Sequence, residues 1–321
     1  MKRKICVITG SRAEYGLLQP LLEELKKNKE FQLQIVVTGM HLSKAHGLTF
    51  KVIEKDNFRI TKKVNIQLTA DTSLGITRSM GYAVSRFGDA FVELNPDLII
   101  CLGDRYEIFS AVASALIHCI PVAHISGGEL TEGAFDDALR HSITKMSHIH
   151  FTATEEYRNR VIQLGEQPNS VYNVGALGLD NIYRLKLLSK AELEKQLKFQ
   201  FKKRNLLVTF HPVTLEKESV KQQFQNLLKA LDSFEETQII FTKANADTNG
   251  SLINMMIEQY CKKKLFKAVW FTSLGQLRYL SVLRYVDAMI GNSSSGMVEA
   301  PSFQIPTVNI GDRQKGRNRV K

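Results

Sequence analysis

The stretch KICVITGSRAEYGLLQPLLEELKK (4–27) places an apolar run directly before a short turn and an amphipathic segment. The run from Lys4 to Thr9 is typical of a buried strand, and the leucine spacing from Tyr15 to Lys27 is typical of a helix. A strand that leads into a helix is the first half of a βαβ unit. The stretch therefore predicts a parallel sheet covered by helices.

The same alternation continues along the 321 residues. In the first half it predicts a long helix at Ser73–Leu94 and four more strands, at 33–38, 98–100, 122–125 and 148–152. A polar segment (181–204) interrupts the rhythm, which then restarts with strands at 205–210, 238–242, 267–271, 287–291 and 307–310. We therefore predict an α/β protein with two domains, residues 1–180 and 181–321.

The composition is that of an ordinary globular protein, with 44% hydrophobic and 23% charged residues. The amino terminus has too few apolar residues for a signal peptide, and no later apolar run approaches the roughly 20 residues of a membrane span. Four cysteines are scattered without a CxxC pair. They predict reduced, buried thiols, a cytoplasmic location and no structural zinc.

The net charge of +11 is compatible with nucleic acid, a membrane surface or a small anionic ligand. The basic clusters lie far apart, mostly at expected helix ends, and no aromatic residues interleave with them. This scatter favours a small anion over nucleic acid or a membrane. The clusters are Lys26-Lys27, Lys62-Lys63, Lys202-Lys203-Arg204 and Lys262-Lys263-Lys264.

Ligands of parallel sheets bind beyond the carboxyl ends of the strands. Among the loops expected there, GNSSSG (291–296) offers Ser293, Ser294, Ser295 and Gly296 at the start of a helix, where backbone amides and hydroxyls favour a phosphate. Helix capping by one serine is the alternative. Glu299, expected two turns into that helix, suits ribose hydroxyls or is a solvated surface glutamate.

The turn TGSRAEY (9–15) departs from the GxGxxG pattern, so it gives little support to a dinucleotide cofactor. Arg12 either clamps a diphosphate or pairs with Glu14 or another surface carboxylate. In LGDRYE (102–107), Asp104 either caps the next helix, the simpler interpretation, or acts on substrate. His211 follows a strand in FHPVT (210–214) and either transfers a proton or bonds the backbone.

The segment HISGGELTEGAFDDALRH (124–141) concentrates ionisable side chains around a glycine pair. Such a cluster can supply one general base and one general acid, and its spacing lacks the pattern of a metal site. In VNIGDRQKGR (308–317), three basic residues either neutralise a departing diphosphate or face solvent. The ionisable residues are His124, Glu129, Glu132, Asp136, Asp137, Arg140 and His141, and the basic ones are Arg313, Lys315 and Arg317.

Six ordered segments together resemble the hydrolysing UDP-N-acetylglucosamine 2-epimerases of bacterial sialic acid synthesis. These are GSRAEYG, LGDRYEIFS, HISGGE with DDALRHSITKMSH, FHPVT, GNSSSGMVEAP and VNIGDRQKGR. The resemblance implies a glycosyltransferase B-like fold, in which a UDP-sugar binds in the cleft between two Rossmann-like domains, and the second domain (181–321) is the one that binds the nucleotide. It implies loss of UDP and of the C2 proton to give a glycal, which water converts to N-acetylmannosamine. It implies no cofactor or metal, and we expect a homo-oligomer, either a dimer or a tetramer.

Matching positions carry the family's site residues onto this chain. Asp104, Glu129 and Asp136 resemble the acid/base carboxylates, with Glu132 as a further candidate. The phosphate contacts of the family are matched by His211, Ser293, Ser294 and Arg313. Glu299 resembles the ribose contact, and Arg12 resembles a further diphosphate ligand. We count His211 among the catalytic residues, and we expect Arg105 and Gly296 to contact the substrate.

Two departures from the family matter. Ser126 stands where several relatives carry glutamate, which shifts the expected base towards Glu129. Relatives continue for several dozen residues beyond Lys321, so the second domain is expected to lack helices over its last strands. The open alternatives are a UDP-2,4-diacetamido-6-deoxy hexose substrate, a non-hydrolysing epimerase, a glycosyltransferase of the same fold and a non-catalytic sensor.

Overall fold

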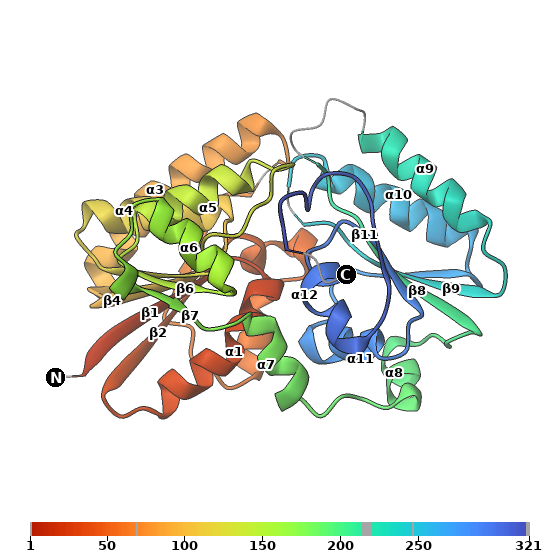
Figure 1. Ribbon diagram of the computed structural model, residues 1–321, viewed down its shortest axis with the longest axis horizontal. Coiled ribbons are helices and arrows are strands. Elements are labelled where there is room, and N and C mark those ends of the chain that lie inside the picture. The colour runs from red at the N-terminus through yellow and green to blue at the C-terminus, as the bar shows by residue number, and fades with distance from the viewer. Residues whose placement is uncertain (1, 69, 214–219, 246, 319–321) are drawn as a thin grey trace. The chain divides into compact units, whose positions relative to one another are not determined.

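The computed structural model describes residues 2–68, 70–213, 220–245 and 247–318 (Figure 1). Contacts within the chain divide it into two compact units. The first contains residues 1–130 and 135–180, and the second contains residues 131–134 and 181–321. The short segment Thr131–Ala134 therefore belongs to the second unit, although its neighbours in sequence belong to the first.

The first unit is built on a seven-stranded parallel sheet with the order β3-β2-β1-β4-β5-β6-β7. The strands are β1 (Arg3–Thr9), β2 (Phe31–Thr38), β3 (Lys62–Val64), β4 (Leu98–Leu102), β5 (Val122–Ile125), β6 (Ile149–Thr152) and β7 (Val171–Asn173). The helices are α1 (Arg12–Lys27), α2 (Phe50–Lys55), α3 (Ser73–Leu94), α4 (Tyr106–Ile117), α5 (Asp136–Lys145), α6 (Glu155–Gln163) and α7 (Leu177–Arg184), the last of which crosses the division.

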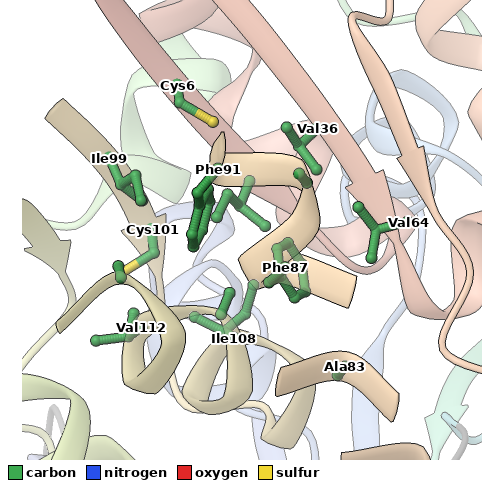
Figure 2. Close-up of a cluster of buried hydrophobic side chains, with 14 of the residues drawn as sticks. Cys6, Val36, Val64, Ala83, Phe87, Phe91, Ile99, Cys101, Ile108 and Val112 are labelled. Atoms are coloured by element: carbon green, nitrogen blue, oxygen red, sulfur yellow. The ribbon is translucent and has the colours of Figure 1, made fainter. Parts of the chain in front are cut away.

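Both faces of this sheet are buried, because successive side chains of a strand point to opposite faces. Cys6 and Ile8 of β1 join a core with α3 and α4, whereas Ile5 and Val7 join a core with α1. Figure 2 shows the first core, with the rings of Phe87 and Phe91 packed among aliphatic side chains. The apolar runs of the sequence are continuous because the central residues of these strands are covered on both faces.

The second unit repeats the design with a five-stranded parallel sheet in the order β10-β9-β8-β11-β12. The strands are β8 (Arg204–Thr209), β9 (Thr237–Thr242), β10 (Ala268–Phe271), β11 (Ala288–Gly291) and β12 (Thr307–Asn309). Among the described residues the helices are α8 (Lys190–Leu197), α9 (Val220–Asp232), α10 (Gly250–Lys263), α11 (Gln276–Leu283) and α12 (Ser295–Val298). Two apolar cores cover the two faces of the sheet.

The predicted α/β fold with two Rossmann-like domains is confirmed, and all ten predicted strands occur within two residues of their expected ends. The sequence interpretation missed β3 and β7, which are three residues long and lie at the sheet edges. Of the four basic clusters, which were expected mostly at helix ends, Lys62-Lys63 lies on β3 instead. Lysines on a short edge strand discourage pairing with another sheet.

Of the four cysteines, Cys6, Cys101 and Cys261 are buried, Cys119 is exposed, and all are free. The expectation of buried thiols thus fails for Cys119, which lies in the turn after α4. Among the described helices, none combines the length and the apolar character that a membrane span requires.

Each sheet has one point at which the strand order reverses, between β1 and β4 in the first unit and between β8 and β11 in the second. Loops that follow the strands at such a point diverge, which leaves space for a ligand. The loops after β1 and β4 carry Arg12 and Asp104, and the loops after β8 and β11 carry His211 and Ser293. The fold therefore places predicted site residues at both reversal points.

Candidate active site

The loop after β4 and the loop after β5 are joined by Arg140 of α5, whose side chain is only 1% exposed. Its guanidinium forms an ion pair with the carboxylate of Asp104 and donates a hydrogen bond to the carbonyl oxygen of Glu129 at 2.7 Å. A buried arginine that binds two loops at once fixes their relative position. Asp104 and the backbone of Glu129, two predicted acid/base positions, are therefore held together.

Asp136 is the first residue of α5 and lies one turn before Arg140. Residues four apart in a helix share a face, so Asp136 and Arg140 lie on the same side of α5. Asp104, Glu129 and Asp136 are all half-buried. Of the three predicted carboxylate residues, Asp104 is paired with the buried Arg140, Glu129 is bound to it through the backbone, and Asp136 lies on the same face of α5.

The interpretation of Asp104 as a helix cap was wrong. The residue at the cap position of α4 is Arg105, without a side-chain cap, and the Asp104 carboxylate is turned to Arg140 instead. Arg105 is buried, and its Nε donates to Oε1 of Glu107 at 2.7 Å.

His124 lies on β5 and is fully buried. Its Nε2 lies 2.7 Å from the carbonyl oxygen of Gly103 and its Nδ1 lies 3.1 Å from the hydroxyl of Thr144, so the proton is on Nε2. Burial lowers the pKa of His124 to about 4. His124 therefore holds Gly103, the residue before Asp104, and is unsuited to exchange protons near neutral pH.

Glu132 lies in the segment that packs with the second unit. The carboxylate of Glu132 lies 3.4 Å from Nζ of Lys315. The backbone N–H of Glu132 donates a hydrogen bond to the carbonyl oxygen of Lys315 at 3.1 Å. A Cβ on the neighbouring Gly133 would lie 2.5 Å from the carbonyl oxygen of Asp312, so the two backbones touch and glycine is required. Glu132 therefore takes part in an exposed ion pair of the second unit.

The loop after β1 leads into α1 through Ser11, whose hydroxyl accepts a hydrogen bond from the Glu14 N–H at 3.3 Å. Arg12 is the first residue of α1 and is half-buried. The carboxylate of Glu14 accepts a hydrogen bond from the Gly10 N–H at 2.6 Å and is buried. Glu14 is thus a buried group of this loop and not the surface carboxylate that the sequence alternative assigned to Arg12.

In the second unit, the loops after β8 and β11 are joined through Asn292. Gly291 has a φ of +137°, and a Cβ there would lie 1.8 Å from the carbonyl oxygen of Thr209, so only glycine fits. The buried side chain of Asn292 then forms two hydrogen bonds to the backbone of His211. This contact fixes where the chain turns after each strand.

His211 is buried, and its Nδ1 accepts a hydrogen bond from the Asn245 N–H at 3.4 Å. In the neutral ring the proton is therefore on Nε2, which can donate to a phosphate oxygen. The hydrogen bond to the backbone is therefore confirmed, and the role of His211 in proton transfer stays a prediction. Thr214, the last residue of the FHPVT segment, lies outside the described residues.

The serine loop uses part of its polar groups internally. Ser295 Oγ accepts from the hydroxyl of Tyr279 at 2.6 Å, and Ser293 Oγ accepts from the Ser295 N–H at 3.3 Å. Ser293 and Ser294 are half-buried, whereas Gly296 packs so closely on Thr307 that a Cβ would lie 2.5 Å from its Cγ2. Gly296 is therefore explained by packing against β12.

Glu299 was expected two turns into the helix that follows the serines, but this helix is shorter than predicted. It is the single turn α12, and Glu299 is its carboxyl-terminal cap. Pro301 follows two residues later and cannot continue an α-helical hydrogen-bond ladder. Glu299 is half-buried and close enough to Tyr279 for its charge to help raise the pKa of that phenol.

The loop after β12 returns to Asn292. Arg313 Nη1 donates to the carbonyl oxygen of Asn292 at 3.2 Å, and Gln314 Nε2 donates to the same oxygen at 2.9 Å. The interpretation of this basic run as solvent-facing holds for the exposed Lys315 and fails for Arg313, which is half-buried. One end of the second sheet thus gathers a histidine, two serines and an arginine, the side chains that bind phosphate elsewhere.

Sequence reasoning missed Asn292, Gln314 and Glu107. The one usable signal was Asn292, because an asparagine directly after a strand often bonds nearby backbone. Across the described residues, no three His, Cys, Asp or Glu side chains are grouped so that they could hold a metal ion.

The chain matches the family model described as UDP-N-acetylglucosamine 2-epimerase over residues 23–321. It is 48% identical to the GDP/UDP-N,N'-diacetylbacillosamine 2-epimerase (hydrolyzing) of Campylobacter jejuni, covering 100% of this chain and 83% of that protein. It is 47% identical to the polysialic acid biosynthesis protein P7 of Escherichia coli, covering 99% and 81%.

Solved structures show the same fold. The UDP-GlcNAc 2-epimerase of Neisseria meningitidis bound to UDP-GlcNAc superposes with a TM-score of 0.78. The alignment covers 97% of this chain and 84% of that one at 17% sequence identity. At that identity the likeness concerns the fold alone.

Proposed function

Because the chain belongs to the UDP-N-acetylglucosamine 2-epimerase family, we propose that it is a hydrolysing 2-epimerase that converts UDP-N-acetylglucosamine to N-acetylmannosamine and UDP. The observation that carries the proposal is the group of carboxylate residues around the buried Arg140 in the first unit. Removal of a proton from a carbon atom needs a positioned base, and Arg140 fixes the Asp104 carboxylate and the backbone of Glu129.

The proposed reaction has two steps. A carboxylate removes the C2 proton, the bond from C1 to the UDP oxygen breaks, and a C1–C2 double bond forms. Water then adds its oxygen to C1, and C2 receives a proton on the opposite face, which inverts C2. We assign the base to Glu129, because position 126, where several relatives carry glutamate, is serine in this chain. We assign Asp104 and Asp136 to the remaining proton transfers and to charge stabilisation.

The departing UDP carries the charge that the enzyme must stabilise. We assign this task to the Nε2–H of His211, the hydroxyls of Ser293 and Ser294 and the guanidinium of Arg313. Donors fixed before the reaction stabilise developing charge without reorganisation. We further assign the ribose hydroxyls to Glu299 and the diphosphate to Arg12 and Arg105.

A second candidate substrate is UDP-N,N'-diacetylbacillosamine. It is favoured by the 48% identity to the Campylobacter jejuni relative, whose name carries that sugar. Both sugars have a 2-acetamido group and a C2 proton, so the same carboxylates serve either reaction. The expected cytoplasmic location and homo-oligomeric state stay predictions.

The test is to incubate the purified protein with each UDP-sugar in D₂O and to follow the products by NMR. The proposal expects free UDP and N-acetylmannosamine in equal amounts, with deuterium at C2. The Asp104→Asn variant is the control for a contaminating activity. Accumulation of UDP-N-acetylmannosamine would show the non-hydrolysing reaction, and faster turnover of the diacetamido sugar would favour the second candidate.

A further inference from the structure

Two buried carboxyl groups of the first unit have no part in the chemistry assigned above. Glu14 lies on α1 and Glu107, whose side chain is 0% exposed, lies on α4. One oxygen of each, Oε1 of Glu14 and Oε2 of Glu107, is buried and has no hydrogen-bond partner among the described residues. Burying two ionised carboxylates with one cation is costly, so their presence needs an explanation.

The remaining oxygens of this pair hold the backbone and one arginine. Glu14 Oε2 accepts from the Gly10 N–H at 2.6 Å, and Glu107 Oε1 accepts from Nε of Arg105 at 2.7 Å. Glu107 also lies directly against Gly10, since a Cβ on that glycine would be 2.6 Å from Glu107 Oε1. The loop that leads to Arg12 is therefore fixed from two sides.

Three adjacent strands meet at this point. β2, β1 and β4 are neighbours in the sheet, and the loops after them contribute Gly39, Gly10 and Arg105. A Cβ on Gly39 would lie 3.0 Å from Glu107 Oε1, and the N–H of His41 donates to the Gly10 carbonyl oxygen at 3.2 Å. The carboxyl group of Glu107 thus lies against the loops after all three strands.

We propose that Glu14 and Glu107 are a positioning pair, which shares one proton and thereby holds Arg12 and Arg105 in the arrangement that binds the diphosphate of the substrate. The inference rests on the proposed function, because it takes these arginines as substrate ligands. Neither carboxyl group touches the substrate. Their role is to fix the loop after β1 and the guanidinium of Arg105.

The charges around the pair explain why a shared proton matters. Burial, followed by the charge of Glu107, raises the pKa of Glu14 to about 7, and Arg105 opposes this rise. The other ionisable groups nearby are Arg12, His41, which burial keeps neutral, and the buried thiol of Cys101. Without the proton, two carboxylates face one another with Arg105 as their near counter-ion, and repulsion loosens the Gly10 loop.

The experiment measures the Kd of UDP-glucose by calorimetry and the KM and kcat of UDP-N-acetylglucosamine hydrolysis from pH 5.5 to 9. The diphosphate of either nucleotide sugar has no group that titrates near pH 7. In the wild type, Kd and KM are expected to rise about 5- to 10-fold as the pH passes 7, with a smaller change in kcat. Glu14→Gln keeps an acceptor for the Gly10 N–H and cannot ionise, so this rise is expected to disappear.

Glu30→Gln is the matched control, because Glu30 is an exposed glutamate of the same unit. Glu107→Gln is the second variant and is expected to weaken binding at every pH, because it replaces the charged partner of Arg105 by a neutral one. A wild type whose Kd and KM do not rise near pH 7 would overturn the inference whether or not the variants fold. So would a Glu14→Gln variant with the wild-type rise.

The two proposals fail in different ways. If UDP-glucose binds with the expected pH dependence and no 2-acetamido sugar is hydrolysed, the positioning pair stands and the proposed reaction falls. If hydrolysis occurs without that pH dependence, the reaction stands and the pair falls. A wild type that binds no nucleotide sugar would overturn both.

Discussion

The side-chain oxygen of Asn292 accepts a hydrogen bond from the backbone N–H of His211 at 2.7 Å, and its amide donates one to the carbonyl oxygen of His211 at 2.8 Å. The backbone oxygen of Asn292 accepts from Arg313 and Gln314. One fully buried residue therefore positions both His211 and Arg313, which come from loops about a hundred residues apart in the sequence. In the proposed function this residue sets the geometry of the UDP-binding groups.

Asn292→Ala is expected to lower the free energy of unfolding by about 2–4 kcal/mol, because it leaves the buried N–H and carbonyl of His211 without partners. We also expect UDP to bind about tenfold more weakly. Urea denaturation and calorimetry measure the two effects. Gln222→Ala, an exposed change on α9, is the control and should stay within about 0.5 kcal/mol of the wild type. Unchanged UDP affinity in a destabilised Asn292→Ala protein would show that Asn292 serves folding only.

Arg140→Lys tests the bridge between the loops after β4 and β5. Lysine keeps the charge but lacks the planar fork that binds the Asp104 carboxylate and the Glu129 carbonyl together. We expect kcat to fall about 100-fold while the Kd for UDP changes little, since Arg140 contacts the acid/base cluster and none of the groups assigned to UDP. Steady-state kinetics and calorimetry provide the two numbers.

Arg59→Lys is the control for that change, because Arg59 is an exposed arginine of the same unit. Equal losses of kcat and UDP affinity in Arg140→Lys would indicate a general loss of structure and would refute a specific role in the acid/base cluster.

The carboxylate assignment predicts that Asp104→Asn, Glu129→Gln and Asp136→Asn bind UDP normally and lose turnover by about 10²- to 10⁴-fold. Each variant keeps the shape of the side chain and removes its capacity to accept a proton. Glu54→Gln is the matched control, because Glu54 forms an exposed ion pair with Lys63 in the first unit. Near-native rates in all three variants would remove the assignment.

The strands were predictable because both faces of each sheet are covered, so residues such as Cys6, Val7 and Ile8 form an unbroken apolar run. The parallel arrangement indicated the carboxyl ends of the strands and so the loops that carry Asp104, His211 and Ser293, whereas the reversal points came only from the structure. The short edge strands β3 and β7 lack such runs. They form because a neighbouring strand supplies hydrogen bonds, and no local sequence pattern predicts this pairing.

The contacts that organise the site are long-range and could not be predicted. Glu132 bonds to Lys315, 183 residues away, and this contact assigns the segment Thr131–Ala134 to the second unit. Glu14 and Glu107 have the spacing of ordinary helix residues, and only the fold shows that both are buried. The three serines of the phosphate loop looked equivalent, whereas Ser295 is occupied by Tyr279.

Three buried groups make the stability of the protein depend on pH. Burial lowers the pKa of His41 and His124 from the ordinary 6.5 to about 4, so unfolding takes up protons between these values. Their contribution to stability is complete above pH 6.5 and is lost as the pH falls towards 4. Glu14 acts in the opposite direction, because its pKa is raised from 4.5 to about 7. Its contribution is complete below pH 4.5 and is lost as the pH rises through 7.

Glu14→Gln removes the opposing contribution and leaves the two histidines. Between pH 4.5 and 6.5 we therefore expect the free energy of unfolding to rise with pH more steeply in Glu14→Gln than in the wild type. The difference in slope is at most one proton, or about 1.4 kcal/mol per pH unit. Urea denaturation at a series of pH values measures it, and Glu30→Gln should follow the wild type. The difference between the two plots of unfolding free energy against pH measures the proton that Glu14 retains on folding. Plots of equal slope for Glu14→Gln and the wild type would therefore contradict a raised pKa of Glu14.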